Sequence, residues 1–218
     1  MDNGIKNYIF DLDGTVIDSC EEVLRCFELA FAKANYPINK NRLTSDLIGP
    51  PLKQIVQNIV PELKDEIVLE NIISNFRNIY DNDTEDVTVI YTGVKEVLNN
   101  LKKQNKTVFL ATLKPSKPTL RIVNDFNLKN IFNDIYTIDK FGNLMTKKEM
   151  IEDIIIKYNL NKSETVMIGD APSDVISANE AGIISIGALW GYGSDKTDLI
   201  ANSKFIIKNI GELGCLKI

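Results

Sequence analysis

From about residue 87 onward, short apolar runs alternate with longer segments whose apolar residues recur every three or four positions. Continuous apolar runs are typical of strands buried on both faces, whereas the wider spacing is typical of amphipathic helices. Together with the apolar run at 8–10, these runs predict strands at 107–112, 135–138, 165–168, 183–186 and 205–207. The periodic segments predict helices at 93–104, 115–126, 147–158 and 173–181. This succession predicts an α/β fold, a doubly wound parallel sheet that helices cover on both faces.

The segment between the first strand and residue 87 has a different pattern. Helical spacing covers 21–35, 51–60 and 62–80, with no convincing strand among them, and prolines mark the breaks. We therefore expect a smaller, all-helical cap domain at 18–86, inserted into a Rossmann-like core formed by 1–17 and 87–218. The acidic stretch 81–86 is the expected return linker.

Composition narrows the class of protein. The chain has 218 residues, of which 44% are hydrophobic and 25% charged, as in ordinary globular proteins. No apolar stretch reaches the ~18 residues of a membrane span, and the first residues lack signal-peptide features, so we expect a cytoplasmic protein without a membrane partner. The odd number of cysteines, three, argues against a disulfide framework. A net charge of −5 gives no general attraction to a nucleic acid polymer.

The chain contains no histidine. This absence excludes Ser-His-Asp and Cys-His catalysis and histidine-ligated zinc. Any proton transfer near neutral pH must use carboxylates, lysine, tyrosine or water. With 30 acidic residues and no cluster of soft ligands, a hard cation such as Mg²⁺ is the expected metal.

The strongest chemical motif follows the first predicted strand, which ends in Asp11-Leu12-Asp13-Gly14-Thr15. Two carboxylates at the end of a buried strand suit a site where one attacks and the other carries a proton, with a cation bridging the first to an anionic substrate. The alternative is an Asp-Gly hairpin turn. We expect 16–18 to be too short to pair back as a strand, which disfavours the hairpin.

Other strands deliver polar groups to the same edge of the predicted sheet, where loops at the carboxyl ends converge. These groups are Thr112 beside Leu113, the pair Lys147 and Lys148, and Asp170 with Asp174. A carboxylate and a phosphate ~4 Å apart repel by about 4 kcal/mol per unit charge pair at an effective dielectric near 20. A cation held by Asp11 and Asp170 would offset that repulsion, so the combination predicts phosphoryl transfer. Asp174 is expected to orient the site or to reach the metal through water.

These motifs, in this order and spacing, resemble the haloacid dehalogenase superfamily over nearly the whole chain. Segments 48–52, 111–115 and 191–194 are similar to phosphoglycolate-phosphatase-like and 5′-nucleotidase-like members. The resemblance implies a Mg²⁺-dependent phosphatase acting on a small phosphorylated metabolite through an aspartyl phosphate. It assigns Asp11 as nucleophile and Asp13 as acid/base, Thr112, Leu113 and Lys147 to phosphate, and Asp11, Asp13 and Asp170 to the metal, with Gly14, Thr15 and Asp174 in support. Asp13 would contact the metal through its backbone carbonyl.

Several features depart from the family pattern or leave alternatives open. Leu113 replaces a small polar residue, so it offers only its backbone N–H, and 139–146 lacks a proline-rich lead-in. Either Lys147 or Lys148 could be the lysine of the family's third motif. The x-Glu-Met-Ile that follows fits the family's register for Lys147. The alternatives are a phosphosugar mutase of the β-phosphoglucomutase kind, which tends to carry Val where this chain has Thr15, and a non-catalytic phospho-ligand-binding protein. The physiological substrate, its contacts in the cap and the oligomeric state stay open.

Overall fold

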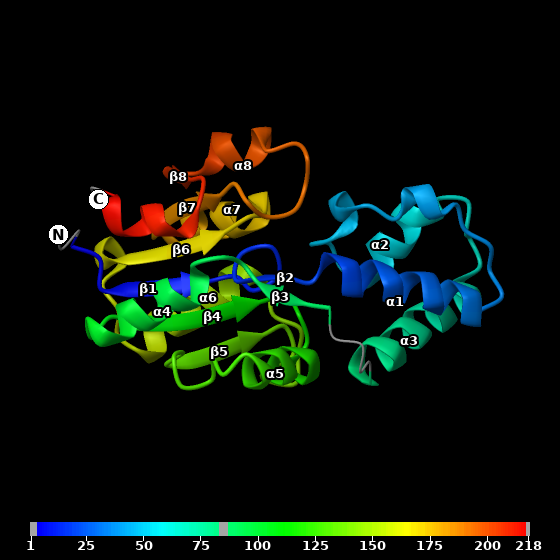
Figure 1. Ribbon diagram of the computed structural model, residues 1–218, viewed down its shortest axis with the longest axis horizontal. Helices are drawn as coiled ribbons and strands as arrows, with labels where there is room; N and C mark the ends of the chain where they lie inside the picture. Colours follow the sequence, from blue (N-terminus) through cyan, green and yellow to red (C-terminus); the bar gives the residue numbers. More distant parts are fainter. Residues whose placement is uncertain (1–3, 83–86, 217–218) are drawn as a thin grey trace. The chain divides into compact units, whose positions relative to one another are not determined.

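The computed structural model describes residues 4–82 and 87–216, which form two compact units. One unit takes the chain up to Asp18, then Ile90–Gly191, and the chain from Asp195 onward. The other takes Ser19–Val89 and Tyr192–Ser194. Figure 1 shows the sheet in the first unit and the helices of the second. Each unit has its own apolar core, and each is described by itself below.

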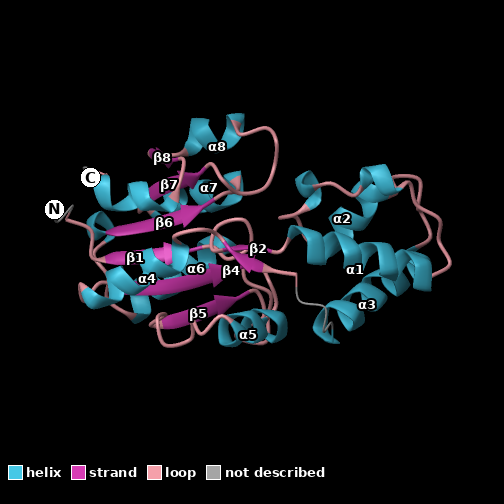
Figure 2. Cartoon of the chain, viewed as in Figure 1, coloured by secondary structure: helices cyan, strands magenta, loops and turns pink. Residues whose placement is uncertain are grey.

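The first unit is built on a six-stranded sheet in which every pairing is parallel. The strand order is β5-β4-β1-β6-β7-β8 (Figure 2). The strands are β1 (Asn7–Phe10), β4 (Thr107–Thr112), β5 (Asp134–Thr137), β6 (Thr165–Gly169), β7 (Ile184–Ala188) and β8 (Phe205–Ile207). The sheet confirms the predicted doubly wound α/β fold. It places β1 between β4 and β6, in the middle of the sheet.

Alternate residues of the central strands pack into different cores. Tyr8 and Phe10 pack into the core on one face of the sheet, whereas Ile9 packs into the core on the other. This alternation is the period-two geometry of a strand buried on both faces. Helices α4 (Val94–Lys103) and α5 (Ser116–Asp125) cover the first face, and α6 (Lys147–Lys157) and α7 (Pro172–Ala181) the second.

The second unit is helical. Its elements are α1 (Cys20–Lys33), η1 (Lys40–Arg42), η2 (Ser45–Leu47), α2 (Leu52–Ile59) and α3 (Glu66–Asn82). Stacked aromatic rings link α1 to α3, where the Phe27 and Phe76 centroids lie 4.1 Å apart. Within α3, Phe76 also stacks on Tyr80, with centroids 5.4 Å apart. Residues 81 and 82 of the expected linker belong to α3, and residues 83–86 lie outside the described part of the chain.

Two features of the structure lie outside the expected strands and boundaries. Residues 17 and 18 form a short strand that was not predicted, β2 (Ile17–Asp18). It pairs with β3 (Val89–Ile90) in a separate two-stranded sheet and not with β1, although Ile17 makes a single bridge to Asp13. A tight turn follows β1, in which the Leu12 carbonyl accepts three consecutive amides, those of residues 15–17. This turn returns the chain without a hairpin.

Tyr192–Ser194 was expected in the core but groups with the helical unit. The Ser19 amide donates to the Tyr192 hydroxyl at 2.5 Å, and the Ser194 amide donates to Asp46 Oδ1 at 2.7 Å. These polar bonds connect segments more than a hundred residues apart, so no local sequence pattern indicates them. Helix α8 (Thr197–Asn202) follows this segment and was also not predicted. Within 4–82 and 87–216, no helix has the length and apolarity to cross a membrane.

An ion cluster joins the C-terminal end of α6 to β5. Asp134 accepts hydrogen bonds from Lys140 at 2.5 Å, Lys157 at 2.9 Å and the Tyr158 hydroxyl at 3.0 Å. Partial burial alone would raise the pKa of Asp134, but these donors outweigh it and lower the pKa to about 2. Since α6 begins at Lys147, this cluster holds the far end of the helix that carries a candidate site residue.

We expect Asp134→Asn to lower the free energy of unfolding by about 1–2 kcal/mol at pH 7. The folded-state pKa lies below the ordinary value of 3.8, so the ionised carboxylate stabilises the fold above that value and loses its effect as the pH falls toward 2. Urea denaturation of both proteins at pH 7, 5 and 3 measures the difference. A difference that does not shrink with acid would contradict the assignment.

Candidate active site

Asp11 is delivered by β1 and is nearly buried, with 8% of its surface exposed. Its amide donates to the Ile168 carbonyl at 2.9 Å, which extends the β1–β6 ladder by one residue. The chain then turns through Gly14, whose φ of +82° lies in the left-handed region. The sequence after the strand therefore bends back at once and leaves Asp11 at the carboxyl edge of the sheet.

Asp170 follows β6, and its side chain packs against two glycines that are distant in the sequence, Gly14 and Gly191. A Cβ at Gly14 would lie 2.2 Å from Asp170 Oδ2, and a Cβ at Gly191 would lie 2.3 Å from Asp170 Cβ. Neither distance is sterically possible, so both positions require glycine. The Thr15 hydroxyl donates to Asp170 Oδ1 at 3.1 Å, and the Trp190 indole donates to the Thr15 carbonyl at 3.1 Å. These contacts bring Gly14 and Thr15 next to Asp170, and the supporting role expected for both stays a prediction.

Asp174 completes a cluster of three buried carboxylates. It lies in the first turn of α7, where its Oδ2 accepts the Ala171 amide at 3.2 Å. One oxygen each of Asp11, Asp170 and Asp174 lies within 4.8 Å of the others. Carboxylate oxygens at this spacing are the donors that a hard divalent cation prefers. The Asp13 carboxylate is not part of this group, and the expected metal contact through the Asp13 carbonyl stays a prediction.

Lys147 lies among these carboxylates. Its Nζ forms an ion pair with Asp11, lies 3.0 Å from Asp174 Oδ1 and donates to the Ala111 carbonyl at 2.7 Å. A capping box between Thr146 and Glu149 starts α6 and thereby places Lys147 at its first position. The motif T-x-x-E is visible in the sequence.

Lys148 instead lies on the exposed side of α6. Its Nζ is 3.7 Å from Glu180 Oε2, and 41% of its side chain is exposed, compared with 4% for Lys147. The structure therefore brings Lys147, and not Lys148, to the carboxylates.

The charges of this cluster are not balanced by its lysine. Burial raises the pKa of Asp11 well above its ordinary value; the Lys147 ammonium opposes this, whereas Asp174 and Asp170 add to it. Burial lowers the pKa of Lys147, but its carboxylate partners outweigh that effect and raise the pKa. Lys147 therefore stays protonated, and the excess negative charge around Asp11 favours an additional cation.

Asp13 lies in a different electrostatic environment from Asp11. Its Oδ1 accepts a hydrogen bond from Lys114 Nζ at 2.8 Å, and the Lys114 side chain is 6% exposed. We did not predict Lys114 as a site residue, although it lies two positions after Thr112 in the same strand-end loop. Two aspartates separated by one residue are thus held by two different lysines.

Thr112 and Leu113 lie at the end of β4, next to β1. Thr112 is buried, and its hydroxyl accepts the Lys114 amide at 3.1 Å. Leu113 is partly buried and its side chain packs against the core under α6 and α7. Only the backbone amide of Leu113 could therefore contact a phosphate. The proposed phosphate contacts of both residues stay predictions.

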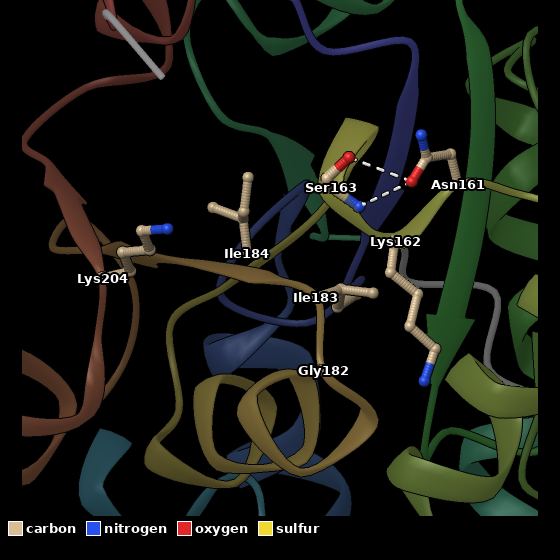
Figure 3. A pocket seen from close by; sticks show the side chains of 7 residues that line it. All are labelled: Asn161, Lys162, Ser163, Gly182, Ile183, Ile184 and Lys204. Atoms are coloured by element: carbon tan, nitrogen blue, oxygen red, sulfur yellow. Dashed lines mark hydrogen bonds between the residues drawn. The ribbon is translucent and has the colours of Figure 1, made fainter.

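A cavity of about 640 Å³ lies at the opposite edge of the sheet. Figure 3 shows its lining, which comes from the segments before β6, β7 and β8: Asn161, Lys162, Ser163, Gly182, Ile183, Ile184 and Lys204. None of these residues belongs to the carboxylate cluster. The carboxylate cluster lies instead at the carboxyl ends of the strands, as expected for a doubly wound sheet.

Comparison with known proteins identifies relatives over nearly the full chain. Residues 8–188 match the family described as haloacid dehalogenase-like hydrolases. The chain is 27% identical to a phosphoglycolate phosphatase of Vibrio parahaemolyticus (96% of this chain, 94% of the relative) and 28% identical to a 5′-nucleotidase of Pseudomonas aeruginosa (87% and 85%). The crystal structure of a predicted phosphatase from Clostridium acetobutylicum superposes with a TM-score of 0.82 at 28% identity, covering 96% of both chains.

We expect Lys147→Met to destabilise the protein by about 3–5 kcal/mol in EDTA, since it leaves buried carboxylates without their cation. The matched variant Lys148→Met should change the free energy of unfolding by no more than about 0.5 kcal/mol, because its ion pair is exposed. Urea denaturation measures both. Equal losses in the two variants would show that Lys147 does not neutralise the cluster.

Proposed function

We propose that this chain, which belongs to the haloacid dehalogenase-like hydrolase family and is a phosphatase of that family, hydrolyses a small phosphorylated metabolite through an aspartyl phosphate on Asp11. The observation that carries the proposal is the separation of Asp11 and Asp13 into different environments. Asp11 lies with Asp170, Asp174 and Lys147, whereas Asp13 pairs with Lys114. Two carboxylates with different surroundings suit two roles, nucleophile and acid/base.

The donor set supports Mg²⁺ as the cofactor. Asp11, Asp170 and Asp174 offer hard oxygen ligands, and their negative charge exceeds that of the Lys147 ammonium. Mg²⁺ would offset the repulsion between Asp11 and a phosphate and would polarise the phosphoryl group. These three carboxylates therefore fit a Mg²⁺ ion.

In the first half of the proposed reaction, an Asp11 oxygen attacks phosphorus and the bond to the leaving oxygen breaks. The electron pair stays on the leaving oxygen, which takes a proton from the Asp13 carboxyl group. Lys147 neutralises charge on the transferred group, and the Thr112 hydroxyl and Leu113 amide donate to its oxygens. The carboxylate left on Asp13 then takes a proton from water, and the oxygen of this water attacks phosphorus and releases Asp11.

The names of two relatives support a substrate class for this proposal. One is named a phosphoglycolate phosphatase and another a 5′-nucleotidase, and both names describe small phosphomonoesters. We therefore propose a small phosphomonoester for this chain. A screen over phosphoglycolate, nucleoside monophosphates, sugar phosphates and pyrophosphate tests the class. With glucose 1-phosphate, release of inorganic phosphate favours hydrolysis, whereas interconversion to another sugar phosphate indicates the mutase alternative.

We expect Asp11→Asn to abolish release of p-nitrophenol from p-nitrophenyl phosphate in Mg²⁺, because an amide oxygen is a poor nucleophile. The fold should persist, and in EDTA its stability at pH 7 should rise. Burial raises the pKa of Asp11, so its ionised form opposes folding above the ordinary carboxyl range. Turnover and urea denaturation are the two measurements. Substantial residual turnover would remove Asp11 from the nucleophile role.

We expect Asp170→Ala to weaken Mg²⁺ binding by at least about 10-fold, the size of the loss when an outer-shell partner is removed, because it deletes one of the three buried carboxylates that could hold the ion. The measurement is the Mg²⁺ concentration that gives half-maximal activity, with isothermal titration calorimetry as an independent readout. Lys148→Met serves as the control and should titrate like the unaltered protein. An unchanged titration for Asp170→Ala would contradict the assignment.

A further inference from the structure

Lys114 is a buried ammonium group to which the reaction proposed above assigns no part. Its side chain is 6% exposed, and its Nζ lies 2.8 Å from Asp13 Oδ1. A buried lysine is costly unless a charged partner compensates it, and Asp13 is such a partner. We propose that Lys114 is a positioning residue that fixes the Asp13 carboxyl group for proton transfer to the leaving oxygen. This inference rests on the proposed function.

The loop that carries Lys114 is held on both sides. The Lys114 amide donates to the Thr112 hydroxyl at 3.1 Å, and the Thr119 hydroxyl lies 3.5 Å from the Lys114 carbonyl. Two residues further on, the Ser116 amide and hydroxyl donate to Asp139 Oδ1 at 2.9 and 2.6 Å. Side chains thus hold the backbone at 112–116, so Lys114 is pre-organised before a substrate binds.

The geometry of the pair explains how Lys114 acts. A carboxyl group that passes a proton through one oxygen must keep that oxygen directed at the acceptor. Lys114 holds Oδ1 and thereby limits rotation of the group, and its ammonium compensates the negative charge that Asp13 acquires when the proton leaves. In the step itself, the proton moves from Asp13 to the leaving oxygen as the bond between phosphorus and that oxygen breaks.

The two lysines of the site therefore have separate tasks. Lys147 contacts Asp11, Asp174 and the Ala111 carbonyl. Lys114 contacts Asp13, from a different strand end. Loss of Lys114 should consequently affect the step that needs the proton, and loss of Lys147 should affect every phosphoryl transfer. This difference makes the inference testable apart from a general loss of activity.

The test compares leaving groups that differ in their need for a proton. Ethyl phosphate releases an alkoxide that must be protonated, whereas p-nitrophenyl phosphate releases a stable anion. We expect Lys114→Met to lower kcat/KM for ethyl phosphate by about 10- to 100-fold and that for p-nitrophenyl phosphate by less than about threefold. The value of kcat/KM is the correct measure because it covers the steps up to departure of the leaving group. The exposed Lys129, changed to Met, is the matched control.

A second variant tests whether Lys114 acts through Asp13. In an Asp13→Asn background, the additional change Lys114→Met should cause no further loss with ethyl phosphate. If Lys114→Met fails to fold, as thermal melting would show, Lys114→Arg keeps the charge but moves it. We then expect the ratio of the two kcat/KM values to change in the same direction, by a smaller factor.

Two outcomes would overturn the inference. Equal losses with both esters would indicate a merely structural lysine. A rise in KM with phosphoglycolate, without any change for ethyl phosphate, would make Lys114 a substrate-binding residue instead. Failure of the proposed function is a separate result, because Asp11→Asn would then retain activity whatever Lys114 does.

Discussion

Repulsion among buried carboxylates is the constraint on which the rest of this molecule depends. Asp11, Asp170 and Asp174 bring oxygens within 4.8 Å of one another, with Lys147 as the ammonium between Asp11 and Asp174. Such a cluster opposes folding unless cations compensate it. The same repulsion underlies the proposed chemistry, because a cluster with excess negative charge favours a hard divalent cation, which would in turn attract a phosphate.

The parallel sheet solves the geometric part of this problem. Because β1 lies between β4 and β6, three successive strand ends deliver their residues to one edge. The register pairs Phe10 with Leu110 and with Ile168, so the residues that follow lie side by side. Gly14 and Gly191 have no Cβ atom, and this leaves room for the Asp170 side chain. Close approach of the acids is thus a property of backbone packing.

Much of the fold could be predicted from the sequence because the central strands are buried on both faces. Continuous apolar runs, such as 107–112, mark these strands, and the helices that cover them have a clear helical spacing. The predictions failed where tertiary contacts override local pattern. Ile17–Asp18 forms a strand because it meets the distant Val89–Ile90, and Tyr192–Ser194 groups with the helical unit through hydrogen bonds to Ser19 and Asp46.

The sequence by itself determined which chemical groups are present and where they lie along the strands. Without histidine and with aspartates after two strands, it excluded histidine chemistry and favoured carboxylates, lysines and a hard cation. Only the tertiary structure decided which lysine meets which carboxylate. Lys114 and Asp13 are 101 positions apart, and Lys147 and Asp11 are 136 apart. The physical reason is that strand register and helix placement, set by the packing of two cores, bring distant charges into contact.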